Sequence, residues 1–128
     1  MKQTYYTDRF AFQREHVCGR TLNVGCGDDP ADLRARGAIN VDCEAVDGVT
    51  GRVNAIHLLY DARDLPFTAE WDTIILGDIL EHMNDRDFVR TIQSSLRALT
   101  PNGRLVLTLP EDGRLLRGDG ARGPDRNV

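Results

Sequence analysis

The chain has 128 residues, of which 41% are hydrophobic and 28% are charged, and its formal net charge is −4. This length suits one folded domain with a hydrophobic core, and the composition excludes an intrinsically disordered chain. The acidic balance excludes the basic surface that binds nucleic acid, and no apolar run has the length of a membrane span or a signal peptide. We therefore expect a cytoplasmic protein with no nucleic-acid partner and no membrane partner.

The first half of the chain predicts short helices and strands in alternation. Residues 8–17 fit a short helix, and residues 20–24 fit the first strand. A brief helix is expected over residues 30–36, because proline suits the first helical turn and Gly37 suits the helix end. Residues 38–42 then predict a second short strand that ends in an acid.

The second half continues the alternation. Residues 57–60 fit a third strand, and residues 71–76 form a compact apolar run that is typical of a buried strand. An amphipathic helix is expected over residues 85–99. A turn at residues 100–103 and a fifth strand at residues 104–109 follow it. Strands that alternate with helices predict a parallel, doubly wound sheet.

The composition changes after Pro110. Residues 111–128 contain four glycines, one proline and four arginines, with only two sizeable apolar side chains in the middle. We therefore expect one folded domain over residues 1–110 and a disordered tail over residues 111–128.

The cysteines predict free thiols. Cys18, Cys26 and Cys43 are odd in number and form no Cys-x-x-Cys pair. This pattern favours a reducing compartment and argues against a disulfide framework and a structural zinc site. Cys26 lies between two glycines, and we interpret its side chain as a small filler and not as a nucleophile.

The most informative segment is residues 22–30, Leu-Asn-Val-Gly-Cys-Gly-Asp-Asp-Pro. Gly25 and Gly27 follow a strand and precede a helix, which is the arrangement that brings backbone close to a nucleotide-like ligand. Asp28 and Asp29 would repel a pyrophosphate, and either one also fits a helix cap. The loop favours a ligand with an adenosine-like body, no phosphate and a positive charge, as in S-adenosylmethionine.

Further segments at matching order and spacing resemble those of class I S-adenosylmethionine-dependent methyltransferases of the type 11 style. Besides the glycine turn, the matching segments are residues 40–42, 61–67, 71–82 and 99–109. A lone glycine pair is weak evidence for this family, whereas five segments in the family's order and spacing are a specific resemblance. The resemblance covers about residues 18–110. It implies a Rossmann-like α/β fold with a mostly parallel five-stranded sheet of order 3-2-1-4-5.

The resemblance assigns one group of residues to the methionine end of the cofactor. It implies that the backbone of Gly25, Cys26 and Gly27 contacts this end, since glycine has no Cβ to prevent the approach. Gly77 and Asp78 end the central strand and would lie beside the sulfonium. The alternative for the glycines is an ordinary turn between a strand and a helix.

A second group is assigned to the nucleoside end. The resemblance implies that Asp42 accepts hydrogen bonds from both ribose hydroxyls, and that Asp61 accepts one from the adenine amino group. Ala62 would hold the edge of the adenine ring with its backbone. The alternatives are a solvated loop acid for Asp42 and an ordinary helix cap for Asp61.

His82 is the candidate catalytic residue. Methyl transfer to oxygen or nitrogen releases a proton, and histidine titrates near neutral pH, so His82 fits a general base. The alternative is a surface or packing histidine at a helix end. The activity implied is methyl transfer from S-adenosylmethionine to a small-molecule acceptor.

The chain is short for the family, whose members continue past the fifth strand with a sixth and a seventh. Three interpretations stand: a truncation, a natural minimal domain, or a homodimer that pairs through the exposed edge of the fifth strand. The alternative function is a degenerate or truncated, non-catalytic domain that binds S-adenosylmethionine or a partner protein. A dinucleotide oxidoreductase is disfavoured by Pro30 and the two preceding aspartates.

Overall fold

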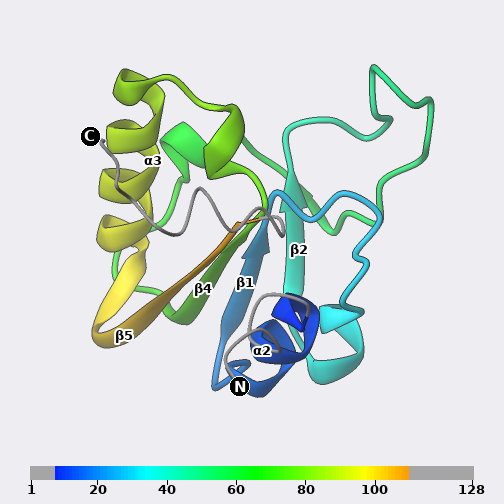
Figure 1. Ribbon diagram of the computed structural model, residues 1–128. Coiled ribbons are helices and arrows are strands. Elements are labelled where there is room, and N and C mark those ends of the chain that lie inside the picture. The colour runs from blue at the N-terminus through cyan, green and yellow to red at the C-terminus, as the bar shows by residue number, and fades with distance from the viewer. Residues whose placement is uncertain (1–7, 110–128) are drawn as a thin grey trace.

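The strands form one parallel sheet in the computed structural model, which describes residues 8–109 (Figure 1). The order is β3-β2-β1-β4-β5, and every pair of neighbours is parallel. The predicted fold class and strand order are therefore confirmed. The predicted tail, residues 111–128, lies outside the described residues. The strands are β1 (Thr21–Val24), β2 (Ile39–Asp42), β3 (Leu58–Leu59), β4 (Trp71–Gly77) and β5 (Leu99–Thr108).

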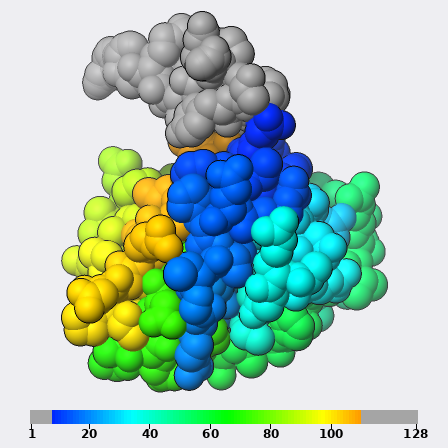
Figure 2. Space-filling view, turned by 90° about the horizontal axis from the view of Figure 1, so that it is seen from below, coloured from blue at the N-terminus to red at the C-terminus, as the bar shows by residue number. Residues whose placement is uncertain are grey.

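Within residues 8–109, two α-helices and three short 3-10 turns accompany the sheet. They are α2 (Arg9–Glu15), η1 (Leu33–Arg36), η2 (Ala62–Asp64), η3 (Leu80–His82) and α3 (Asp85–Ala98). Figure 2 shows α2 and the segment leading into β1, in blue, between β5 and the region of η1 and β2. Within residues 8–109, none of the helices combines the length and the apolarity that crossing a membrane requires.

The core consists of two apolar clusters on opposite faces of the sheet. Successive side chains of a strand point to opposite faces, so Ile74 belongs to one cluster and Ile75 to the other. The cluster of Ile74 packs against Ile92 of α3, and the cluster of Ile75 packs against Phe10 of α2. Burial on both faces explains why β4 is an almost continuous apolar run. The two layers leave the carboxyl ends of the strands open.

The helix predicted over residues 30–36 is shorter than expected. η1 begins at Leu33 and not at residue 30, and it is a single 3-10 turn. Asp29 and Asp32 have φ angles of 60° and 54°, and these left-handed conformations interrupt a right-handed helix between them. Gly37, with φ of 94°, ends the turn as predicted.

The predicted turn before the fifth strand is also wrong. β5 starts at Leu99, directly after α3, and the segment expected to turn is part of the strand. Trp71 pairs with Leu99, whereas Thr73 pairs with Arg104, so extra residues of β5 bulge between these pairs. The bulge accommodates the extra residues of β5 without ending the strand. The residues whose composition predicts a turn therefore remain part of the sheet.

Candidate ligand-binding site

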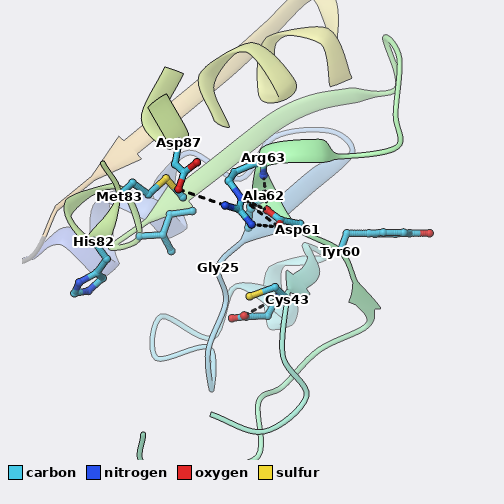
Figure 3. A pocket seen from close by; sticks show the side chains of 12 residues that line it. Gly25, Cys43, Tyr60, Asp61, Ala62, Arg63, His82, Met83 and Asp87 are labelled. Atoms are coloured by element: carbon cyan, nitrogen blue, oxygen red, sulfur yellow. Dashed lines mark hydrogen bonds and ion pairs between the residues drawn. The ribbon is translucent and has the colours of Figure 1, made fainter. Parts of the chain in front are cut away.

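Two cavities lie at the carboxyl ends of the strands. The larger has a volume of about 280 Å³ and is lined by five of the predicted site residues: Gly25, Asp42, Asp61, Ala62 and His82 (Figure 3). The smaller has a volume of about 110 Å³ and is lined by four of them: Gly25, Cys26, Gly77 and Asp78. Gly25 lines both cavities. It therefore lies between the residues predicted for the nucleoside end of the cofactor and those predicted for its methionine end.

Gly25 turns the chain sharply at the end of β1. Its φ is 75°, a conformation that side chains disfavour, and a Cβ here would overlap the Ile79 side chain. The N–H groups of Gly25 and Cys26 donate to the Val41 carbonyl at 2.8 and 3.1 Å. The turn is thereby fastened to the end of β2, where the next predicted site residue lies.

Asp42 is joined to the glycine turn through its carboxylate. Oδ2 accepts a hydrogen bond from the N–H of Gly27 at 2.9 Å, and Oδ1 accepts one from the N–H of Cys43 at 2.8 Å. Gly27 lines neither cavity, but this bond makes it part of the site. A carboxylate has about four lone-pair positions, so each oxygen of Asp42 keeps one for a ligand hydroxyl.

Asp29 is the buried anchor of the loop. It is 6% exposed, and its carboxylate accepts hydrogen bonds from the backbone N–H groups of Leu33 and Arg34 at 2.9 and 3.2 Å. The side-chain amides of Asn23 and Asn40 add two more at 3.3 and 3.2 Å. Asp29 therefore accepts the first two N–H groups of η1, as a cap would, although the residue at the N-cap position is Asp32, whose side chain makes no such hydrogen bond.

Asp28 has a different environment. Its Oδ2 lies 3.0 Å from Nη1 of Arg52, and both side chains are exposed. Because both aspartates have donors of their own, their repulsion of a phosphate is weaker than the sequence alone indicates. The acidic character of the site rests instead on the carboxylates that line the larger cavity.

We expect Asp29→Ala to lower the free energy of unfolding by about 3 kcal/mol, because four donors in a buried network lose their acceptor. The measurement is a urea unfolding curve, compared with that of Asp28→Ala. The control removes an exposed ion pair and should cost less than about 1 kcal/mol. Equal losses in the two variants would contradict the anchoring role of Asp29.

Asp61 is held by Arg63, two residues further along the chain. Arg63 donates to the Asp61 carboxylate from its backbone N–H at 2.8 Å, from Nε at 3.0 Å and from Nη2 at 2.6 Å. These hydrogen bonds keep the pKa of Asp61 below its ordinary value. Asp61 therefore caps η2, as its alternative interpretation holds, while it also lines the larger cavity.

His82 lies at the margin of the larger cavity. Its side chain is 78% exposed, and its Nε2 lies 3.3 Å from Oε2 of Glu81. In Figure 3 it stands apart from the group formed by Asp61 and Arg63. This position gives the imidazole access to solvent.

Asp78, which lines the smaller cavity, has one carboxylate oxygen with a partner and one without a partner in the described part of the chain. Asp78 follows β4 with φ of 59°, and its Oδ2 pairs with Nε of Arg9 at 2.8 Å. Its Oδ1 is buried and has no hydrogen-bond partner among residues 8–109. Buried polar atoms are nearly always satisfied, so this oxygen is an exception among the described residues.

Cys26 behaves as a filler and not as a nucleophile. It is 4% exposed, and burial, together with the charge of Asp42, raises the pKa of its thiol to about 12. The thiol is therefore protonated near neutral pH, and the thiolate is the reactive form.

Solved structures share this architecture. The PH0226 protein of Pyrococcus horikoshii has a TM-score of 0.63 and 17% sequence identity, over 90% of this chain and 56% of that one. An S-adenosylmethionine-dependent methyltransferase of Leishmania major has a TM-score of 0.58 and 19% identity, over 81% of this chain and 50% of that one. The chain has the fold of class I S-adenosylmethionine-dependent methyltransferases.

Another structure with this methyltransferase fold is the [4+2]-cyclase SpnF, with a TM-score of 0.56 and 28% identity over 80% of this chain and 43% of that one. The chain therefore spans about half the length of the structures it matches. No family model and no curated protein matches it. One fold hosts different reactions, so the chemistry has to be argued from the site.

Two charged residues that line the larger cavity, Arg63 and Asp87, are not among the predicted site residues. Arg63 reaches Asp87 at the start of α3, with Nη1 3.3 Å from Oδ2, in addition to its bonds with Asp61. Arg63 follows Asp61 by only two positions, and this spacing is a local signal that could have predicted their ion pair. The contact with Asp87 spans 24 positions and has no local signal.

Proposed function

We propose that this chain binds S-adenosylmethionine and transfers its methyl group to a small-molecule acceptor. The observation that carries the proposal is the convergence of Gly25, Asp42 and Asp61 on one cavity, at the ends of the neighbouring strands β1, β2 and β3. In doubly wound sheets, ligands bind at this edge, where the strand order reverses. The methyltransferase fold and the five matching sequence segments point to the same ligand.

The donors and acceptors of the two cavities fit the proposed cofactor. The free lone pairs of Asp42 suit the two ribose hydroxyls, and Asp61 and Ala62, which line the same cavity, suit the adenine. The unpartnered Oδ1 of Asp78 suits a cationic group at the methionine end. Gly25 separates the two regions, so a ligand that occupies both would pass across its Cα.

The charges of the larger cavity also favour a cationic ligand. Three carboxylates line it, those of Asp42, Asp61 and Asp87, against the single guanidinium of Arg63. The cofactor supplies a methyl group already activated on a sulfonium. The chain's own residues then have to bind, orient the ligand and exclude water, which suffices for an in-line displacement.

Cysteine alkylation tests where the ligand binds. Cys43 is exposed and lines the larger cavity, whereas Cys18 is exposed and lines neither cavity. We expect S-adenosylhomocysteine to slow the alkylation of Cys43 by about tenfold at mildly alkaline pH, because bound ligand excludes the reagent. Cys18 serves as the internal control, and Cys26 should react slowly throughout. Equal Cys43 rates with and without millimolar ligand, together with no calorimetric signal, would contradict the proposal.

His82 is proposed as the general base. We expect His82→Ala to leave the affinity for S-adenosylhomocysteine unchanged and to lower turnover by about 100-fold, within the usual range for loss of a general base. The measurement is a single-turnover assay across a panel of small-molecule acceptors. Unchanged turnover would exclude this role, and His57→Ala is the control, since His57 lines neither cavity.

A second candidate function is binding without turnover. The observation that favours it is that most of the predicted site residues in the two cavities are proposed for ligand binding, whereas the one residue proposed for chemistry, His82, is 78% exposed at the margin of the larger cavity. Binding that Asp42→Ala abolishes, with no transfer to any acceptor tested, would support this candidate.

We also propose that the chain pairs with a second copy through β5. Among residues 8–109, β5 is an edge strand that pairs only with β4, and Leu107 on it is 44% exposed. Sedimentation velocity tests this proposal, and a monomer at high protein concentration would contradict it.

A further inference from the structure

We infer that Arg63 determines the specificity of the site for the ligand's base: its guanidinium leaves the Asp61 carboxylate with a single acceptor position, which suits one N–H donor. The inference deepens the proposed function and rests on it, because it assumes that the base lies against Asp61. It concerns a residue that neither the resemblance nor the alternative interpretation of Asp61 assigns to the ligand.

The hydrogen bonds of Asp61 leave one position open. A carboxylate offers about four lone-pair positions. Three donor hydrogens of Arg63 point at them, since Oδ1 accepts from the backbone N–H and from Nε, and Oδ2 accepts from Nη2. The longer contact of Nε with Oδ2, at 3.2 Å, shares a hydrogen already counted. The remaining lone pair belongs to Oδ2, and 42% of the Asp61 side chain is still exposed.

The guanidinium is held from a second side. Its Nη1 reaches Oδ2 of Asp87, whose own N–H donates to the side chain of Asn84 at 2.8 Å. Arg63 therefore links the loop after β3 to the first turn of α3 (Figure 3). Its planar fork is fixed by two carboxylates, and a lysine could not reproduce this geometry.

The charge state of Asp61 makes the open position an acceptor. Hydrogen bonds from Arg63 are the main reason that the pKa of Asp61 is lowered. The carboxylate is therefore ionised at neutral pH and has no proton to donate. A base with an amino group at this edge, such as adenine, can donate to Oδ2. A base with a carbonyl there, such as hypoxanthine, would place oxygen against oxygen and lose the bond.

Arg90 provides a matched control. It contributes positive charge near Asp61, as Arg63 does, but it makes no hydrogen bond or ion pair within the described part of the chain. Comparing the two arginines separates the effect of charge from the effect of the bidentate contact.

The experiment is calorimetric titration of the full chain with S-adenosylhomocysteine and with S-inosylhomocysteine, its deaminated analogue. We expect the unmodified chain to prefer the adenine ligand by at least about tenfold, since a site that loses its hydrogen-bond donor rejects the ligand. In Arg63→Ala and Arg63→Lys the preference should fall to about threefold or less, while Arg90→Ala keeps the preference of the unmodified chain.

The outcomes separate the inference from the proposed function. Failure of both ligands to bind the unmodified chain would overturn the proposed function. Binding of both with equal affinity, or an unchanged preference in Arg63→Lys, would overturn the inference alone. If Arg63→Ala does not fold, Asp61→Asn decides, because its amide can donate to a carbonyl and should remove or reverse the preference. A preference that survives Asp61→Asn would also overturn the inference.

Discussion

Replacing Asp42 with alanine is expected to weaken the binding of S-adenosylhomocysteine by about 100-fold or more. The proposed role gives this carboxylate two hydrogen bonds to ribose hydroxyls, and bonds to a charged acceptor contribute about 1.5–3 kcal/mol each. The carboxylate is already oriented by the N–H groups of Gly27 and Cys43, so no reorganisation is needed when the ligand binds. Calorimetric titration measures the loss directly.

Two further variants show whether the loss comes from the ribose contact. Asp42→Asn keeps the shape and one acceptor oxygen, so we expect an intermediate affinity. Glu44→Ala removes a nearby exposed acid that lines neither cavity, and its affinity should match that of the unmodified chain. If the affinity of Asp42→Ala stays within about threefold of that of the unmodified chain, the ribose role is refuted, because losing hydrogen bonds to a charged acceptor should cost more than this.

The second large effect is expected for Gly25→Ala. The left-handed conformation at Gly25, with φ of 75°, costs an alanine about 1–2 kcal/mol. The new methyl group would also overlap the Ile79 side chain, which lines the larger cavity. We expect a loss of about 2–4 kcal/mol in the free energy of unfolding and no measurable ligand binding.

Gly27→Ala is the matched control for Gly25→Ala. Gly27 has φ of 53°, but an added Cβ would meet no heavy atom within 4 Å. Only the conformational cost should remain, about 1–2 kcal/mol. The double variant Gly25→Ala/Ile79→Ala relieves the overlap and should recover part of the stability. If the two glycine variants lose the same stability, overlap with Ile79 is not the cause.

The elements that the sequence predicted well are those whose signal is local. β4 is a run of apolar residues long enough to be recognised by itself, and α3 has an apolar stripe together with a capping Asn84. The glycine turn and the acid at the end of β2 were recognised because each directly follows a short apolar segment. Their meeting at one edge of the sheet follows from the parallel order of the strands.

The predictions that failed concern the conformation of single residues and the pairing of distant ones. The left-handed conformations of Asp29 and Asp32 shorten η1. In the sequence, Pro30 and Gly37 indicate the start and the end of a longer helix. The bulge in β5 arises because Trp71 holds Leu99 in the sheet. Pairing in the sheet overrides turn propensity here, since backbone groups of a core strand need hydrogen-bond partners.

By itself, the sequence determined the alternation of strands and helices and the sharp turn at Gly25, because these are local properties. The strand order and the candidate roles of Asp42 and Asp61 came from the resemblance that its five segments carry. Only the tertiary structure decided that Gly27 holds Asp42, that Arg63 holds Asp61 and reaches Asp87, and that Asp78 keeps an oxygen without a partner. These contacts join residues from different strands and helices. Their distances depend on how the layers pack, and no periodicity along the chain encodes them.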